Sequence, residues 1–246
     1  MRLLIFISKE DDFYGSAKRI QDISKINCDI VYIEDFINEM GWNKITDFDI
    51  IYFLCNGEKV NYSFKKIMSM NKKCEIINRE YLLKNYCKLL VQQKINKNGV
   101  PTPKIINVSE IDNVKFPIFC KQNSHTGIVF KAYTKRTIME FFQKFDLTDF
   151  YLEEAVTSDL KKHNEFKAYF ANGNVYPKDG ENSFNDYIKD ICVKISNSLY
   201  ELQAFSVDFI ENDNGLYVID VNVASGFYMS TGARKEFVKK YVNREK

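Results

Sequence analysis

The sequence predicts a mixed α/β (α+β) protein in which a small parallel sheet at the N-terminus is followed by hairpins and helices. Residues 3–7, 29–33 and 50–54 are short apolar runs with polar helical segments between them. Such runs are typical of buried parallel strands. Near the C-terminus, two runs of β-branched and aromatic residues, 205–210 and 216–221, flank a turn cluster at 212–215. This second pattern predicts a β-hairpin.

Composition narrows the class of protein. The 246 residues are 45% hydrophobic and 28% charged, which allows one or two domains with a sizeable core. The net charge is +2 with lysines spread along the chain, so we expect no nucleic-acid partner, which would need basic residues on one face. The six cysteines form no CxxC pair, and no apolar run is long enough for a signal peptide or a membrane span. We therefore expect free thiols, no membrane partner and a cytoplasmic location.

The N-terminal third contains a candidate ligand loop and a long helix. Residues 8–15 leave the first strand at its carboxyl end, where open α/β sheets tend to bind ligands. Apolar spacing then predicts one helix over residues 78–98, ended by Gly99 and an extended segment at 100–103. Lys84 and Lys88 would lie one turn apart on it, and a solvated pair is the simplest interpretation of both.

The middle of the chain predicts a strand, a polar loop and a returning strand. The strand 116–121, FPIFCK, ends on Lys121, and the loop 122–127 leads into a strand over 128–133. Backbone N–H groups of such a flap could cover phosphates, although this loop has a single glycine. His125 within it is interpreted as a surface histidine. A helix over 137–145 precedes a strand over 150–156, FYLEEAV, which carries Glu153 and Glu154.

The remaining segments predict a further hairpin and two helices. Alternation over residues 165–170 places Glu165, Lys167 and Tyr169 on one face of a strand, so that face is available for polar chemistry. A turn at 171–174 leads to a return over 175–178. Helices are expected over 184–202, before the C-terminal hairpin, and over 234–244 after it.

The register of the C-terminal hairpin determines its chemistry. A three-residue loop at 213–215 would place Asp208 directly opposite Asp220, with Asn222 on the same face. A two-residue loop would instead mix these acids with apolar side chains. Opposed like charges repel unless a cation lies between them, and two carboxylates with an amide oxygen suit Mg²⁺. The alternative is a solvent-facing hairpin that happens to carry acids.

Taken in order, these segments resemble the ATP-grasp superfamily across nearly the whole chain. That family shows a lysine before a "Gly-hydrophobic-Pro-x-Pro" stop, a "Phe-Pro-x-x-x-Lys" strand, a strand with an adenine-binding glutamate, a ribose-binding acid, and an "Asp…Asp/Glu-x-Asn" metal set. Each motif alone is weak, but five in the right order are much stronger. The matching positions here are Lys88, Lys121, Glu153, Glu165, and the set Asp208, Asp220 and Asn222.

The resemblance implies roles for these residues. Lys88 and Lys121 would hold phosphate oxygens of ATP, since a compact ammonium suits phosphate. Glu153 and the neighbouring backbone, from Glu154 through Val156, would take the adenine edge, and Glu165 would bind the ribose. The acids and Asn222 would hold Mg²⁺, or Mn²⁺ in its place. Most family members join a carboxylate to an amine or thiol through an acyl phosphate.

The chain also departs from the family pattern. Many of the family's ligases have an arginine two residues before the first metal aspartate, where this chain has Ser206. A cation that stabilises the acyl phosphate would then come from elsewhere, with Lys178 and Arg234 as candidate catalytic residues. The chain is also smaller than many relatives, which implies an open acceptor pocket suited to a large partner such as a peptide or a glycan. A small-molecule acceptor is the other expected partner.

We therefore predict a pre-ATP-grasp-like domain over residues 1–77 and an ATP-grasp domain over 78–246, with subdomains at about 116–156 and 157–246. The leading function is an ATP- and Mg²⁺-dependent ligase that forms a C–N bond. The alternatives are a phosphotransferase acting on a small molecule or glycan, and a nucleotide-binding protein without turnover. The substrates and the oligomeric state are left open.

Overall fold

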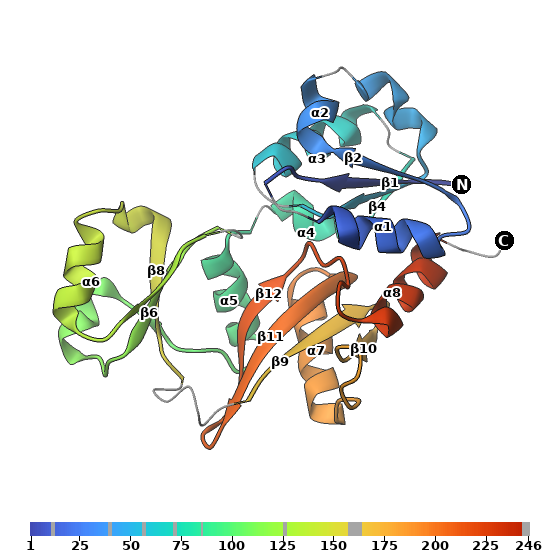
Figure 1. The fold of residues 1–246 in the computed structure, drawn as a ribbon. Coiled ribbons are helices and arrows are strands. Elements are labelled where there is room, and N and C mark those ends of the chain that lie inside the picture. Colours follow the sequence, from blue (N-terminus) through green and yellow to red (C-terminus); the bar gives the residue numbers. More distant parts are fainter. Residues whose placement is uncertain are drawn as a thin grey trace. The chain divides into compact units, whose positions relative to one another are not determined.

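The computed structural model describes residues 1–10, 13–38, 41–55, 58–70, 73–84, 86–124, 127–156 and 164–242 (Figure 1). The chain has the predicted mixed α/β class, with a parallel sheet followed by antiparallel pairing. It divides into two compact units. The first unit consists of Met1–Asn85, Lys167–Val207 and Asn222–Lys246, and the second consists of Tyr86–Phe166 and Asp208–Val221. The predicted domain boundary at residue 77 stays a prediction.

The first unit contains the predicted parallel sheet. Its strands lie in the order β2-β1-β3-β4, and β1 pairs in parallel with both β2 and β3. The three apolar runs of the sequence form β1, β2 and β3, which confirms their prediction. The fourth strand has only two residues, too few to show periodicity in the sequence. The bounds are β1 (Arg2–Ile7), β2 (Asn27–Tyr32), β3 (Ile50–Phe53) and β4 (Glu75–Ile76).

Helices cover both faces of this sheet because alternate residues of β1 point to opposite sides. Leu3 and Ile5 pack with residues of α1, α8 and η4, whereas Leu4 and Phe6 pack with residues of α2, η1 and α3 (Figure 1). All four side chains are fully buried. The helices are α1 (Tyr14–Ile23), α2 (Ile33–Asn38), the 3₁₀ segment η1 (Gly41–Asp47), α3 (Glu58–Met70), α8 (Thr231–Phe237) and the π-helical turn η4 (Val238–Val242).

The predicted single helix over 78–98 is wrong, because the structure has two helices there. They are α4 (Arg79–Lys84) and α5 (Lys88–Lys97). Cys87 is extended, with φ −81° and ψ 164°, and its carbonyl accepts from Val91 N in the first turn of α5. Lys84 and Lys88 therefore lie on different helices, and Lys88 is the first residue of α5. Gly99 follows α5 at φ 78°, which confirms the predicted stop.

The second unit contains an antiparallel sheet of order β5-β8-β6-β7. One face of it packs on α6 through Ile118, Cys120 and Leu152. The alternate residues of β6 and β8, among them Lys121 and Glu153, therefore point to the other face. The bounds are β5 (Ile105–Ile106), η2 (Val108–Asn113), β6 (Ile118–Gln122), β7 (Val129–Ala132), α6 (Lys135–Phe142), η3 (Leu147–Asp149) and β8 (Phe150–Glu154).

The third sheet contains the predicted C-terminal hairpin. Its order is β10-β9-β11-β12, and Gly215 at the turn has φ 130°, a conformation that favours glycine. The facing of Asp208 and Asp220 across the hairpin stays a prediction. The helix predicted over 234–244 begins earlier, because Ser230 caps α8 by accepting from Ala233 N. The bounds are β9 (Asn164–Ala171), β10 (Asn174–Tyr176), α7 (Asp186–Ser198), β11 (Ala204–Asn212) and β12 (Gly215–Asn222).

Three other predictions concern single features. All six cysteines are free, as expected, and all except Cys87 are buried. Within the described ranges, no helix is both long enough and apolar enough to cross a membrane. His125 lies outside the described residues.

Candidate active site

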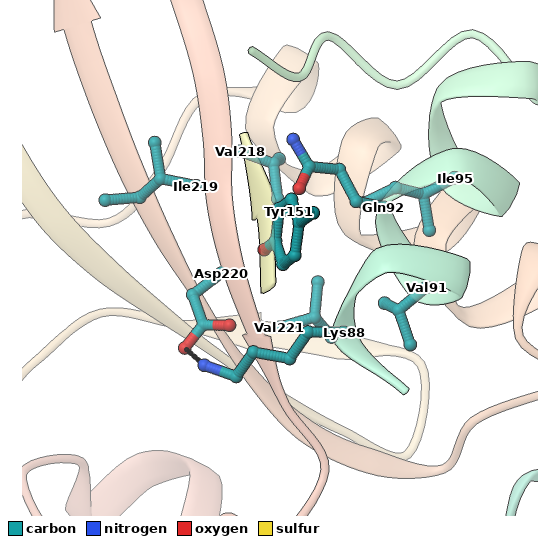
Figure 2. Close-up of a pocket in the computed structure, with 9 residues that line it drawn as sticks. All are labelled: Lys88, Val91, Gln92, Ile95, Tyr151, Val218, Ile219, Asp220 and Val221. Carbon is teal, nitrogen blue, oxygen red and sulfur yellow. Dashed lines mark hydrogen bonds and ion pairs between the residues drawn. The ribbon is translucent and has the colours of Figure 1, made fainter. Parts of the chain in front are cut away.

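Two lysines and two acids predicted separately from the sequence meet as pairs in the second unit. Lys88 Nζ lies 3.1 Å from Asp220 Oδ2, and Lys121 forms an ion pair with Glu153. Figure 2 shows Lys88 of α5 and Asp220 of β12 pointing toward one another. The structure thus brings together four of the predicted site residues.

Local hydrogen bonds position α5 and β12, the elements that contain Lys88 and Asp220. At the start of α5, Leu89 N donates to Asn123 Oδ1 at 2.9 Å, which holds Lys88 beside the loop after β6. On β12, Val218 N donates to Pro101 O at 2.8 Å. The extended Pro-Thr-Pro segment after α5 therefore serves as a partner for β12, and Asp220 lies two residues further along that strand.

Glu153 is the most buried of the four charged side chains, with only 2% of the side chain exposed. One oxygen pairs with Lys121, and the other accepts from Gln92 Nε2 at 3.0 Å. Burial raises the pKa of the Glu153 carboxyl, while Lys121 and Gln92 oppose that rise. The carboxylate is therefore held by two donors in an environment that disfavours its charge.

Lys121 links two strands of this unit. Its ammonium donates to the carbonyl of Ile219 on β12 at 3.1 Å as well as to Glu153 on β8. The side chain is 13% exposed, and that of Lys88 is 17% exposed. Two partly buried ammonium groups are thus positioned by protein acceptors, and each could instead bind an oxyanion such as a phosphate.

A pocket adjoins this charge cluster (Figure 2). Its volume is only about 20 Å³, room for about one water molecule, and its walls are apolar except for a few polar groups. Burial raises the pKa of the Tyr151 hydroxyl, and the charges of Glu153 and Asp220 add to the effect. The lining residues are Lys88, Val91, Gln92 and Ile95 of α5, Tyr151 of β8, and Val218, Ile219, Asp220 and Val221 of β12.

Sequence reasoning missed Gln92 and Tyr151. Gln92 follows Lys88 by one helical turn, and Tyr151 precedes Glu153 by two strand positions, so each shares a face with a predicted residue. That spacing was the available signal. Gln92 is 7% exposed, and its Nε2 donates both to Glu153 and to Pro103 O at 3.1 Å. We therefore interpret Gln92 as a residue that orients Glu153.

The other residues predicted to bind the nucleotide lie in the same unit but outside this cluster. Glu154 points to the opposite face of β8 from Glu153, and its carboxylate lies 3.9 Å from Lys104 Nζ. Its backbone N donates to Lys104 O at 2.9 Å. The Val156 carbonyl accepts from Asn212 Nδ2 at 2.5 Å. Glu165 is exposed on β9, and the roles of all three stay predictions.

The predicted metal ligands are hard oxygen donors that fit Mg²⁺ or Mn²⁺ chemically. Asp208 and Asp220 belong to the second unit, and Asn222 to the first. Asp220 and Asn222 share a face of β12 by alternation. Among the described residues, no three or more His, Cys, Asp or Glu side chains are grouped so that they could hold a metal ion. A set of two carboxylates and one amide would leave further metal positions for oxygens of a substrate.

The two candidate catalytic cations belong to the first unit. Lys178 is partly exposed in the segment after β10, and Arg234 is 8% exposed on α8. Ser206, at the position where many ATP-grasp ligases have arginine, is buried in β11.

Comparisons with known proteins identify the family and the fold. A family model described as the RimK-like ATP-grasp domain matches residues 64–240. No curated protein matches the sequence. Among solved structures, D-alanine–D-alanine ligase from Bacillus anthracis complexed with ATP is 16% identical to this chain, with a TM-score of 0.66. The match covers 92% of this chain and 87% of the ligase chain.

Two further structures are similar over almost their full length. D-cycloserine synthetase DcsG is 10% identical with a TM-score of 0.72, and 97% of each chain is covered. The macrocyclase MdnC from Microcystis aeruginosa, bound with the precursor peptide MdnA, is 11% identical with a TM-score of 0.66. That match covers 99% of this chain and 100% of MdnC. At these identities the likenesses show the fold.

Proposed function

We propose, from the fact that this chain belongs to the RimK-like ATP-grasp domain family, that it is an ATP-dependent ligase joining a carboxylate to an amine. The observation that carries the proposal is the pairing of Lys88 with Asp220 and of Lys121 with Glu153 within one unit. These are the positions to which the family resemblance assigns phosphate, metal and adenine binding. The similar structures include ligases, one of them complexed with ATP.

The proposed reaction has two steps. A substrate carboxylate attacks the terminal phosphorus of ATP, giving an acyl phosphate and ADP. An amine then attacks the acyl carbon, the new C–N bond forms, and phosphate leaves. The amine loses a proton, so the products are an amide, ADP and inorganic phosphate.

Lys88 and Lys121 would bind phosphate oxygens after exchanging their carboxylate partners for the nucleotide. Both ammonium groups are already positioned and partly desolvated, so after this exchange they would stabilise charge on the transferring phosphoryl group. Asp208, Asp220 and Asn222 would hold Mg²⁺ or Mn²⁺, which supplies charge neutralisation at the phosphates when bound.

Glu153 and the backbone from Glu154 through Val156 would recognise the adenine edge, and Glu165 the ribose hydroxyls. The burial of Glu153 and the hydrogen bond from Gln92, which does not depend on Lys121, support a fixed orientation of its carboxylate. Because Ser206 replaces the arginine that many family ligases have, Lys178 or Arg234 would stabilise the acyl phosphate.

The acceptor is the least specified part of the proposal. The printed names of similar structures include a D-alanine ligase and a macrocyclase bound to a precursor peptide. Both kinds of substrate carry carboxylates and amines, so we propose a small-molecule or peptide acceptor, with a glycan as the further option.

Product analysis tests the proposal. The protein is incubated with Mg²⁺, ATP and a metabolite and peptide pool, and nucleotides, phosphate and new masses are measured. A ligase yields ADP, free phosphate and a product that has gained mass by condensation, and Lys121→Ala yields none of them. A phosphorylated product would indicate a phosphotransferase instead, and absence of ADP would indicate a binder without turnover.

A further inference from the structure

The first unit contains a group of charged side chains at the start of α8 that we call the arginine corner. Its members come from three separate segments of the chain but act on one another electrostatically. They are Arg19 of α1, Asp179 of the segment after β10, and Tyr228, Thr231 and Arg234 in and before α8.

Arg234 is a buried cation with unmet hydrogen-bonding capacity. It is 8% exposed, and its Nε has no hydrogen-bond partner among the residues that the structure describes. Its Nη2 lies 3.5 Å from Thr231 Oγ1, at the outer limit of a hydrogen bond. A guanidinium carries five N–H donors, and a buried one is costly unless acceptors meet it.

Arg19 presents a second guanidinium at the surface. Its Nη1 donates to the carbonyl of Tyr228 at 2.8 Å, and its guanidinium lies 4.6 Å from the centre of the Tyr228 ring. These contacts hold an exposed arginine in place. Burial lowers the pKa of Arg234, and the positive charge of Arg19 lowers it further, so the two cations lie within electrostatic range.

Asp179 supplies too little negative charge to balance the two arginines. Its carboxylate accepts from Thr231 N at 2.8 Å and from Thr231 Oγ1 at 2.7 Å. These two bonds, with the charges of Arg234 and Arg19, lower the pKa of Asp179. The carboxylate thus stays charged but is engaged at the start of α8, and the corner keeps an excess positive charge.

We propose that the arginine corner binds a substrate oxyanion, specifically a free carboxylate that takes no part in bond formation. Arg19 offers the exposed contact, and Arg234, within electrostatic range, adds charge from a buried position where attraction is stronger than in water. The planar fork of a guanidinium matches a carboxylate. The inference rests on the proposed ligase function, and it implies a substrate with a free carboxylate beyond the reacting groups, such as an amino acid or a short peptide.

This assignment gives the two candidate catalytic cations different roles. Arg234 would recognise the substrate, and Lys178 would remain the candidate residue for stabilising the acyl phosphate.

Ligand-observed NMR titration with alanine, alaninamide and inorganic phosphate tests the corner directly. Alanine of either configuration and alaninamide both carry an ammonium group, so they differ only in the carboxylate. We expect alanine to bind at least tenfold more tightly than alaninamide, and more tightly than phosphate. Arg19→Gln and Arg234→Gln should each weaken alanine binding at least tenfold. Lys235→Gln, which removes an exposed charge from the same helix, should change it less than twofold.

Three results would overturn the proposal: equal binding of alanine and alaninamide, no binding of either, or the same loss in Lys235→Gln as in the arginine variants. Tighter binding of phosphate than of alanine would overturn the carboxylate assignment. Thermal melts separate recognition from structure. Arg234→Gln removes a buried charge whose Nε has no hydrogen-bond acceptor among the described residues, so its Tm should be equal or higher. A marked fall in Tm would show that Arg234 is structural.

Calorimetry with Mg²⁺-ATP keeps this test distinct from the ligase proposal. The arginine variants should bind the nucleotide within twofold of the wild type. If alanine binds through the arginines but no ADP forms with any pool, the ligase proposal is wrong and the carboxylate-binding proposal is supported. If ADP and a condensation product form while alanine binding is independent of both arginines, the carboxylate-binding proposal is wrong and the ligase proposal is supported.

Discussion

The ammonium of Lys88 lies 3.1 Å from the carboxylate of Asp220, so a residue predicted to bind phosphate forms an ion pair with a predicted metal ligand. Lys121 and Glu153 repeat this arrangement with a predicted adenine ligand. With the proposed roles, nucleotide binding would require an exchange of ionic partners rather than the ordering of free side chains. Release of Asp220 by Lys88 would then free an oxygen donor for the metal, so the proposal couples nucleotide binding to metal binding.

Lys121→Ala should weaken ATP binding at least tenfold, which is about 1.4 kcal/mol. The reason is that a partly buried ammonium, already held by Glu153 and Ile219 O, is lost from the phosphate site. Calorimetric titration with Mg²⁺-ATP measures the change, and Lys144→Ala on the exposed surface is the control. Unchanged affinity in both Lys121→Ala and Lys88→Ala would show that neither lysine binds phosphate.

Gln92→Met should reduce both stability and nucleotide affinity. The substitution keeps the length of the side chain but leaves one oxygen of buried Glu153 without its donor, at a cost of roughly 1–3 kcal/mol. Gln93→Met, on the exposed side of the same helix, is the matched control and should behave as the wild type. Urea unfolding and calorimetry report the two quantities. Equal effects of both substitutions would argue that Gln92 acts only through helix stability.

The sequence contained most of the site residues but not their contacts. Lys88, Lys121, Glu153 and Asp220 stand in linear motifs, so their identity could be predicted. Their pairing depends on how α5, β6, β8 and β12 pack together, which no local pattern encodes. Gln92 and Tyr151 were missed because they belong to no motif and are recognisable only from the face that they share with a motif residue.

Local structure was predictable where an apolar run formed a buried strand. The buried strands of the N-terminal sheet and the C-terminal hairpin follow from apolar runs. The helix predicted over 78–98 failed because apolar spacing continues across Cys87, whose extended backbone interrupts the helix without a proline or glycine to mark it. The strands β4 and β5 have two residues each, too few for any pattern.

Asp220→Asn should abolish ADP formation and change the stability of the nucleotide-free protein by no more than about 1 kcal/mol, since its ion pair is partly solvated. If Asp208 faces Asp220 across the hairpin, relief of that repulsion offsets the lost pair. Thermal melts beside an ADP-release assay measure both quantities. Wild-type turnover would contradict the metal-site proposal, and a large loss of stability would indicate that the acid is structural.

The buried carboxyl of Glu153 predicts a pH dependence of stability. Because its pKa is raised in the folded state, folding is favoured by protonation of Glu153. Its contribution is fully present below the unfolded glutamate pKa of about 4.3 and is lost as the pH rises through the raised folded value. The unfolding free energy of the wild type minus that of Glu153→Gln should therefore fall with rising pH. Urea denaturation from about pH 4 to about pH 8 measures the difference, and a difference that rises with pH would contradict the assignment.

The central claim is that ATP activates a carboxylate as an acyl phosphate that an amine then displaces. Transfer of ¹⁸O tests it most directly, because one carboxylate oxygen must leave with the phosphate. The protein is incubated with Mg²⁺, ATP and a substrate pool whose carboxylates carry ¹⁸O, in unlabelled water, and the phosphate is analysed by mass spectrometry. We predict that phosphate released with ADP carries one ¹⁸O atom. Release of unlabelled phosphate with ADP would contradict the claim, because the phosphoryl group would then have gone to water.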